Sequence, residues 1–387
     1  MKAGIVTHPE YINDELCHII KRSGGLFALK TELGDGLIRF VNSIIARIAW
    51  NRDYAAKNLY TEKQRPISFA ILGSSELNAL CYASPDGSFD FFGVNVGVFL
   101  TLNDIFSRLL SHPAFLPHIG DPSLEREDRT FIPFVYSNVV AQNNSVGVNP
   151  NCKIRRIFSN CMFFTALDFI VFHEMYHLRN GHLEWKRARG EGIAHCETIG
   201  ERNSVSGLHF QALEMDADCG AVRATINTAY DIVKQAPGNY PDETMHAGRQ
   251  VAYGSIKTMV PLVAHSIYTL FRLFDCKEWD VFHQHEFTHP QSPLRQHWML
   301  LTMQELLKVH DEEEYSADQK NDDLWNTISV VERGIASILN DNVDARGIKS
   351  VVTSELANEH LIAVKQAWAS VRNDLLPFKR GGILAPA

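Results

Sequence analysis

The sequence lacks the patterns that mark several large classes of protein. Its seven cysteines are widely spaced and include no CxxC pair, so neither a zinc ribbon nor a thioredoxin-type motif is predicted, and reduced thiols are the simplest interpretation. Lysine and arginine number 37 against 45 aspartates and glutamates, which gives a formal net charge of −8. There is no overall basic surplus to attract nucleic acid or anionic lipid, so we expect no nucleic-acid partner.

Long uninterrupted apolar runs are also missing. Asp168 interrupts the run 163–172, and Pro261 and Arg272 interrupt the run 259–274, so neither reaches the ~18 residues of a transmembrane helix. The N-terminal region carries acidic residues where a signal peptide has its apolar stretch. These absences predict a soluble protein that has no membrane partner and stays in the cytoplasm.

The composition that remains is that of a globular protein. Hydrophobic residues make up 45% of the 387 residues and charged residues 21%, which excludes a disordered chain and a coiled-coil rod. Between residues 67 and 102, runs of β-branched and aromatic residues flank the turn Ser84-Pro-Asp-Gly87, which predicts a β-hairpin. The ranges in which apolar spacing predicts helices are 12–58, 103–118, 154–180 and 208–235. We therefore expect a mainly helical α+β fold with a small β-sheet.

The stretch Ser88–Leu100 is rich in phenylalanine and valine and alternates poorly. We expect an edge strand beside a cleft, to which an extended peptide could add by main-chain hydrogen bonds. An ordinary buried strand is the equally weighted alternative.

The chain is expected to divide near residue 310. Residues 1–310 would form the main domain, with helices from 1–60 packed on it. An acidic loop at 311–323 would lead into C-terminal helices with a regulatory role, in a second segment 311–387. The tail PFKRGGILAPA, residues 377–387, is expected to be frayed.

The most informative segment is the predicted helix that ends near residue 180. It contains the pattern HExxH, with His173, Glu174 and His177. Residues four apart project from one helix face, so both imidazoles can present a nitrogen to one ion, with the glutamate beside a water on that ion. Such an arrangement suits metal-assisted hydrolysis. Two histidines on a half-buried helix are the alternative, but histidines turned inward need partners.

A third metal ligand is expected farther along the chain. Leu183 stands where the metzincin pattern requires a histidine, which excludes that class. Glu214 and Asp218 lie four apart on a predicted helix, where the small residues Ala217 and Gly220 would permit close approach to the first helix. We expect Glu214 to bind the metal and Asp218 to accept a hydrogen bond from a ligand histidine.

Glu197 is the rival third ligand. Glu197 and Glu201 also lie four apart and are nearer to HExxH. Their surroundings, including Gly192 and Gly200, are polar and indicate a loop without an apolar helical face. Glu214 is therefore favoured.

HExxH followed by ExxAD resembles the gluzincins, zinc peptidases whose third ligand is a glutamate. The segment His173–His182 resembles the HExxHxxxxH helix of HtpX-like and CAAX-prenyl-protease-like peptidases. Asn78–Phe89 resembles the hairpin upstream of that helix, and Thr288–Arg295 resembles the downstream HPxxxxR element. All pieces occur in the family's order. Those enzymes are mostly embedded in membranes, whereas this chain is expected to be soluble.

A soluble group is similar as well, though less so in the flanking sequence. The bacterial Lit-type phage-exclusion peptidases carry an apolar helix that ends in HExxH and then ExxAD in a cytoplasmic chain. The ImmA-like regulators, which share HExxH and a later glutamate, are more distant. The resemblance implies a zincin-like fold with an HExxH active-site helix. It also implies a latent protease that is triggered by an activating protein or peptide from a phage.

The metal-site assignments follow from these patterns. His173, His177 and Glu214 would bind Zn²⁺, with Glu174 as general base. Two imidazoles and one carboxylate favour zinc among the divalent ions.

The outlying residues are assigned by resemblance. It implies that His289 and Arg295 flank the site and stabilise the oxyanion or hold substrate. A plain surface histidine and a structural ion-pair partner are the alternatives for these two. Tyr176 is expected to pack, and His182 to be a surface residue at the helix end.

Three functions compete. The first is a zinc-dependent endopeptidase that acts on a cytoplasmic protein substrate. The second is a non-catalytic zincin-fold protein with a regulatory or sensing role, against which the intact Glu174 argues, because a binding module needs no general base. The third is a helical interaction protein in which HExxH is accidental.

Overall fold

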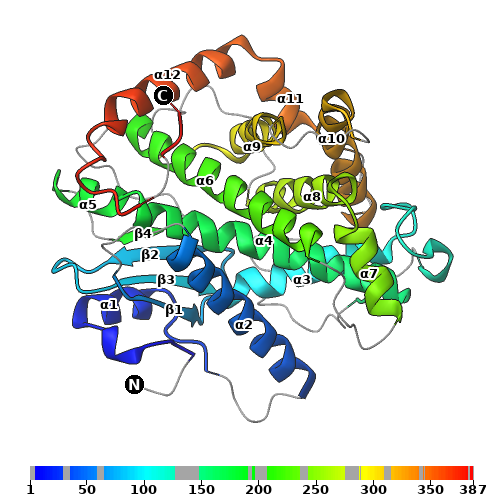
Figure 1. Ribbon diagram of the computed structural model, residues 1–387, viewed down its shortest axis with the longest axis horizontal. Coiled ribbons are helices and arrows are strands. Elements are labelled where there is room, and N and C mark those ends of the chain that lie inside the picture. Colours follow the sequence, from blue (N-terminus) through cyan, green and yellow to red (C-terminus); the bar gives the residue numbers. More distant parts are fainter. Residues whose placement is uncertain are drawn as a thin grey trace.

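The computed structural model describes residues 5–28, 35–58, 65–126, 148–190, 194–196, 207–235, 243–274, 287, 289–308, 315–339, 343, 345–381 and 384–386. These residues form a helical body beside a small mixed sheet (Figure 1), which confirms the mainly helical α+β prediction. The helices are α1 Asp14–Arg22, α2 Asp35–Asn58, α3 Val96–Ser111, α4 Lys153–Arg179, α5 His182–Arg187, α6 Gly207–Lys234, α7 Glu243–Tyr253, α8 Ile256–Phe274, α9 Ser292–Leu307, α10 Ala317–Leu339, α11 Arg346–Val352 and α12 Glu355–Arg372.

The sheet has the strand order β1-β3-β2-β4. Strand β1 (Ile67–Leu72) pairs parallel with β3 (Asp90–Asn95), and β3 pairs antiparallel with β2 (Ala79–Ala83), so the predicted hairpin is confirmed. The short strand β4 (Ala194–Cys196) pairs antiparallel with β2 and was not predicted. Alternate residues supply two cores, one facing α1 and one facing α2, α3 and α4.

The prediction of an edge strand at Ser88–Leu100 is wrong. Strand β3 lies between β1 and β2, and all of its residues are buried, because Phe91 packs toward α1 while Phe92 packs toward α4. The alternative of an ordinary buried strand is correct for residues 90–95. From Val96 the chain is helical, so α3 begins well before the predicted residue 103. A short apolar run does not distinguish a strand from a buried helix by its periodicity.

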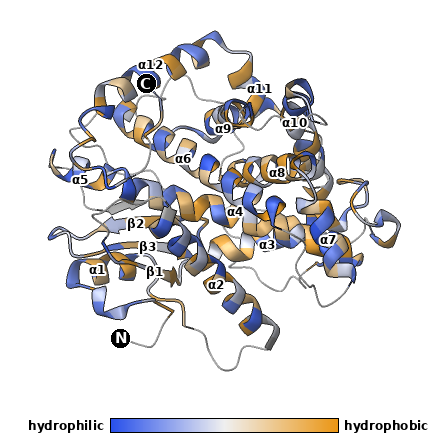
Figure 2. Ribbon diagram, viewed as in Figure 1, coloured by the Kyte–Doolittle hydropathy of each residue, from blue (hydrophilic) through white to orange (hydrophobic). Residues whose placement is uncertain are grey.

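Helix α4 runs through the centre of the molecule. It packs against α2, α3, α6, α7, α8 and strand β2, and apolar residues gather along α3, α4 and α8 (Figure 2). The one charge in its apolar middle, Asp168, accepts hydrogen bonds from Arg47 Nε at 2.7 Å and Asn51 Nδ2 at 2.8 Å. Among the described residues, α4 alone is long and apolar enough to cross a membrane, and 78% of its most apolar window is buried, as in the core helix of a soluble protein.

The segment after residue 310 packs on the same cores. Helix α10 places Leu324, Val331 and Ile335 in the central core, and α12 packs on α6. The domain boundary at 310 stays a prediction. The acidic stretch 311–323 was predicted to be a loop, and this is wrong from Ala317 onward, where α10 begins.

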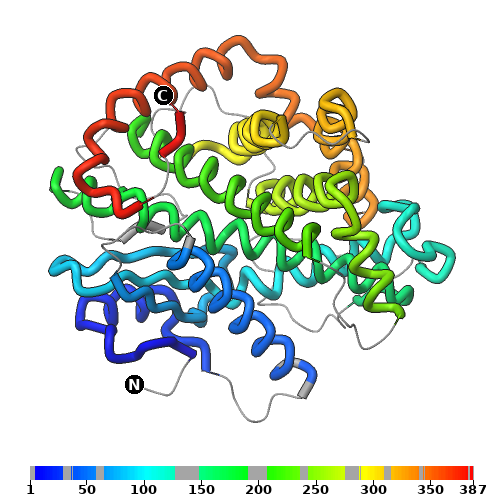
Figure 3. The backbone as a smooth tube through the Cα atoms, in the orientation of Figure 1, coloured from blue at the N-terminus to red at the C-terminus, as the bar shows by residue number. Residues whose placement is uncertain are grey.

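The prediction of a frayed tail is wrong for the described residues. Leu384 is 2% exposed and Ala385 5% exposed. The Trp368 indole of α12 donates hydrogen bonds to the carbonyl oxygens of Ala385 and Pro386, at 3.2 and 2.9 Å. This tail returns past the start of α6 and lies near α5 (Figure 3). It is therefore part of the folded body.

Candidate metal centre

Helices α4 and α6 bring three of the predicted metal ligands together. His173 and His177 lie on consecutive turns of α4, and Glu214 faces them from α6. The two helices approach closely because Gly220 lies against Tyr176: a Cβ built on Gly220 would be 2.1 Å from the tyrosine ring. The predicted close approach through small residues therefore occurs here.

The donor atoms are spaced for one ion. His173 Nε2 and His177 Nε2 are 3.0 Å apart, and each lies 3.3 Å from a Glu214 carboxylate oxygen. A tetrahedral zinc ion with bonds of ~2.0–2.2 Å has donor–donor edges of ~3.3–3.6 Å. All three side chains are at most 1% exposed. Among the described residues this is the one histidine, cysteine and carboxylate group with donors close enough to hold a metal, and its donor set fits zinc.

Asp218 holds the outer nitrogen of His173. Its Oδ1 lies 2.9 Å from His173 Nδ1, and Arg295 Nη2 and Nε donate to its two oxygens at 2.7 and 2.9 Å. Burial raises the pKa of Asp218, but the charge and hydrogen bonds of Arg295 and His173 outweigh it and lower the pKa below its usual value. The carboxylate therefore stays ionised and favours the His173 tautomer with its proton on Nδ1. This leaves the Nε2 lone pair available to bind a metal.

The structure brings Arg295 and His289 to the same cluster. Arg295 lies at the start of α9 and approaches Glu214 to 4.0 Å while it pairs with Asp218. His289 Nε2 lies 3.6 Å from Glu214 Oε1, and its side chain is 9% exposed. Neither residue is a surface group.

Glu174 and Glu197 complete the predicted set. Glu174 is fully buried beside His173 on α4. Glu197 lies outside the described residues.

His182 was predicted to be a surface residue, and this is wrong. It is 1% exposed, and its Nδ1 lies 2.9 Å from His177 Nδ1. In a continuous helix, a residue five positions on is turned ~140° away from the first. Gly181 breaks the helix with a φ of 77° and starts α5, which brings the His182 ring back under His177. Asp216 of α6, which the sequence reasoning did not single out, lies 3.1 Å from His182 Nε2.

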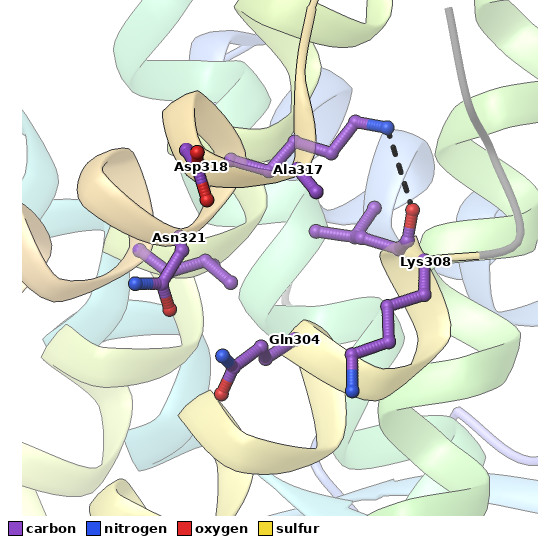
Figure 4. A pocket seen from close by; sticks show the side chains of 8 residues that line it. Gln304, Lys308, Ala317, Asp318 and Asn321 are labelled. Atoms are coloured by element: carbon purple, nitrogen blue, oxygen red, sulfur yellow. Dashed lines mark hydrogen bonds between the residues drawn. The ribbon is translucent and has the colours of Figure 1, made fainter.

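The pocket in Figure 4 lies away from the start of α9, where Arg295 meets the cluster. It opens between the end of α9 and the start of α10, where Lys320 Nζ lies 3.4 Å from the Leu307 carbonyl oxygen. None of the residues that line it is a predicted site residue.

No protein-family model matches the chain. No curated protein and no solved structure matches it either. The functional assignment therefore depends on the geometry of the cluster, and the resemblance to gluzincins stays a prediction.

Proposed function

We propose that the protein is a zinc-dependent endopeptidase of zincin-like architecture that hydrolyses a cytoplasmic protein or peptide. The observation that carries the proposal is the buried group of His173, His177 and Glu214, whose donor atoms are 3.0–3.3 Å apart. Two imidazole nitrogens and one carboxylate at this spacing are the donor set of a three-ligand zinc site with a fourth position left for water.

The residues around the cluster take separate roles in this proposal. A zinc ion held by His173, His177 and Glu214 would lower the pKa of a water molecule at the site. Glu174 would act as general base, accepting the proton of the water that attacks the peptide carbonyl and passing it to the amine that leaves when the C–N bond breaks. His289 donates a hydrogen bond to the carbonyl oxygen as it gains negative charge. Arg295 is a positioning residue, because it holds Asp218 rather than the reacting atoms.

The burial of the cluster supports a latent enzyme. Glu174 and Glu214 have no exposed surface, and the His289 side chain is 9% exposed, so a peptide cannot reach the general base in this arrangement. We infer that the covering residues must move and that an activating protein or peptide moves them. By resemblance, a phage component is the trigger.

The first test is metal content, measured by elemental mass spectrometry on purified protein. We expect one zinc per chain in the wild type, loss of zinc in Glu214→Ala, and retention in the matched variant Glu197→Ala. Loss of zinc only in Glu197→Ala would identify Glu197 as the third ligand. A wild type that holds no metal after zinc is supplied would overturn the proposal.

A non-catalytic zincin-fold regulator is the second candidate, and the same burial of Glu174 favours it. In that case the metal would be structural, and the general base would have no substrate. Glu174→Gln separates the two candidates, because it removes the base and keeps the metal ligands.

A further inference from the structure

A row of buried polar groups extends from His177 away from the metal position. His177 Nδ1 meets His182 Nδ1 at 2.9 Å, His182 Nε2 meets Asp216 Oδ2 at 3.1 Å, and the Ala385 backbone N–H donates to Asp216 Oδ1 at 2.6 Å. We propose that His182, Asp216 and the C-terminal residues 378–381 and 384–386 position His177 as a metal ligand. This inference rests on the proposed function, because it assumes that His177 binds a metal.

The hydrogen positions follow from a single requirement. If His177 presents the lone pair of Nε2 to a metal, its proton must be on Nδ1, and Nδ1–H then donates to His182 Nδ1. His182 must therefore carry its proton on Nε2, which donates to Asp216. The Asp216 carboxylate accepts from this group, from the Asn180 amide and from the Ala385 N–H. Every donor in the row thus has an acceptor.

The two ligand histidines are supported in different ways. His173 is held by Asp218, whose charge is balanced by the Arg295 guanidinium. His177 is held indirectly, because the His182 ring stands between it and the Asp216 carboxylate. That carboxylate is held in turn by the Asn180 amide and the Ala385 backbone N–H. The support of His177 therefore depends on where the C-terminal residues 378–381 and 384–386 lie.

That segment is fixed to the end of α4 by several contacts. The Arg380 backbone N–H donates to the Arg179 carbonyl oxygen at 2.8 Å, and the Arg380 guanidinium donates to the Leu178 carbonyl oxygen and to Asp90. The first bond satisfies the Arg179 carbonyl at the helix end, and the Leu178 oxygen, which also accepts from Gly181 N at 3.4 Å, gains a charged donor. A Cβ at Gly181 would lie 2.6 Å from the Phe378 backbone, so this approach requires glycine.

The experiment measures zinc affinity by competition with a chelator of known affinity, and absorption of the Co²⁺-substituted protein, whose bands report coordination geometry. His182→Phe removes the acceptor for His177, and we expect ~10–100-fold weaker zinc binding and shifted cobalt bands. His182→Asn offers an amide oxygen to the same proton, so we expect a partial return of affinity.

A second variant tests the distant end of the row. Ala385→Pro removes the N–H that meets Asp216 and leaves the carbonyl that accepts from Trp368 and Arg372. We expect zinc binding weaker by a factor of ~10 in Ala385→Pro, and within twofold of the wild type in the matched control Ala385→Gly, which keeps the N–H.

The outcomes separate this inference from the proposed function. Wild-type zinc affinity and cobalt bands in both His182→Phe and Ala385→Pro would overturn the positioning role and leave the metal site standing. A lower melting temperature with unchanged affinity and bands would show that the row is only structural. A wild type that binds neither zinc nor cobalt would overturn both.

Discussion

At the scale of single residues, Glu174 decides between hydrolysis and metal binding alone. It lies one residue after His173 on α4, and glutamine has nearly the same shape but lacks the carboxylate that can accept a proton. For Glu174→Gln we expect zinc content equal to the wild type and a ~10²–10⁴-fold loss of proteolysis. The readout is the set of new protein N-termini in phage-infected cells that express either form.

Two results would contradict this expectation. Equal sets of new N-termini in cells that express the wild type and Glu174→Gln would show that Glu174 is not the general base. Loss of zinc in Glu174→Gln would mean that the side chain supports the metal rather than the reaction. Glu197→Ala, which leaves the predicted base intact, serves as the control for expression.

The contrast between Asp218 and His182 explains what the sequence could predict at this scale. Asp218 follows Glu214 by four residues, so helix geometry alone places both on one face, and the structure has Asp218 on His173. His182 follows His177 by five residues, which a continuous helix would carry away. Only the left-handed turn at Gly181 reverses this, and a single glycine in a polar stretch does not specify that turn.

At the scale of elements, the α4–α6 crossing depends on Gly220. An added Cβ would meet the Tyr176 ring at 2.1 Å, and both residues are buried. We expect Gly220→Ala to lower the free energy of unfolding by ~1–3 kcal/mol, because overpacking outweighs the ~1 kcal/mol gain in helix propensity. Urea unfolding measures the change.

Gly36→Ala in α2 is the matched control, since nothing lies within 4 Å of the added Cβ. It should leave stability unchanged or raise it. If Gly220→Ala unfolds at the same urea concentration as the wild type, the crossing relaxes more readily than the contact suggests, and small residues are not what brings the metal ligands together.

Helix boundaries near the sheet were less predictable than the long helices. Helices α4 and α6 were located within about a residue of their predicted ends, because each carries apolar residues over many turns. The stretch from Val96 was assigned to a strand, although Gly97 N donates to the Ser74 carbonyl oxygen where α3 begins. That contact joins segments distant in sequence, so local pattern does not encode it.

At the scale of the whole molecule, His265 makes stability depend on pH. It is 4% exposed within α8, and burial lowers its pKa to about 4, with the Pro261 carbonyl opposing this and His118 adding to it. Between pH 6.5 and 4 the unfolded chain binds a proton that the folded protein excludes, so stability falls as pH falls through this window. Well above pH 6.5 His265 is neutral in both the folded and the unfolded chain, so it no longer changes the stability.

The expected size is ~2 kcal/mol of lost unfolding free energy between pH 7.5 and pH 5, from one buried group. His265→Gln should remove this part of the difference, whereas the exposed His18→Gln should keep it. Urea unfolding at the two pH values, with a chelator present so that metal release does not contribute, gives the comparison. An unchanged pH difference in His265→Gln would refute the assignment.

The architecture as a whole was predictable only in class. The apolar content and the helix spacing indicated a mainly helical α+β chain. The position of the C-terminal residues could not be predicted, because Trp368 and Asp216 bind them through backbone groups that every sequence has. Backbone donors carry no signature in the residue types, so a buried tail and a frayed one look alike in sequence.

The proposed support of His177 by the C-terminal residues has a consequence for synthesis on the ribosome. A nascent chain that has extended only through α6 already contains His173, His177 and Glu214, the three candidate metal ligands. Arg380, which fixes the segment to Leu178, follows that residue by 202 positions, and Ala385 follows Asp216 by 169. His177 and its partners His182 and Asp216 are therefore synthesised long before the Ala385 N–H that meets Asp216. We expect the proposed metal centre to reach its final geometry only after residue 385 has been made.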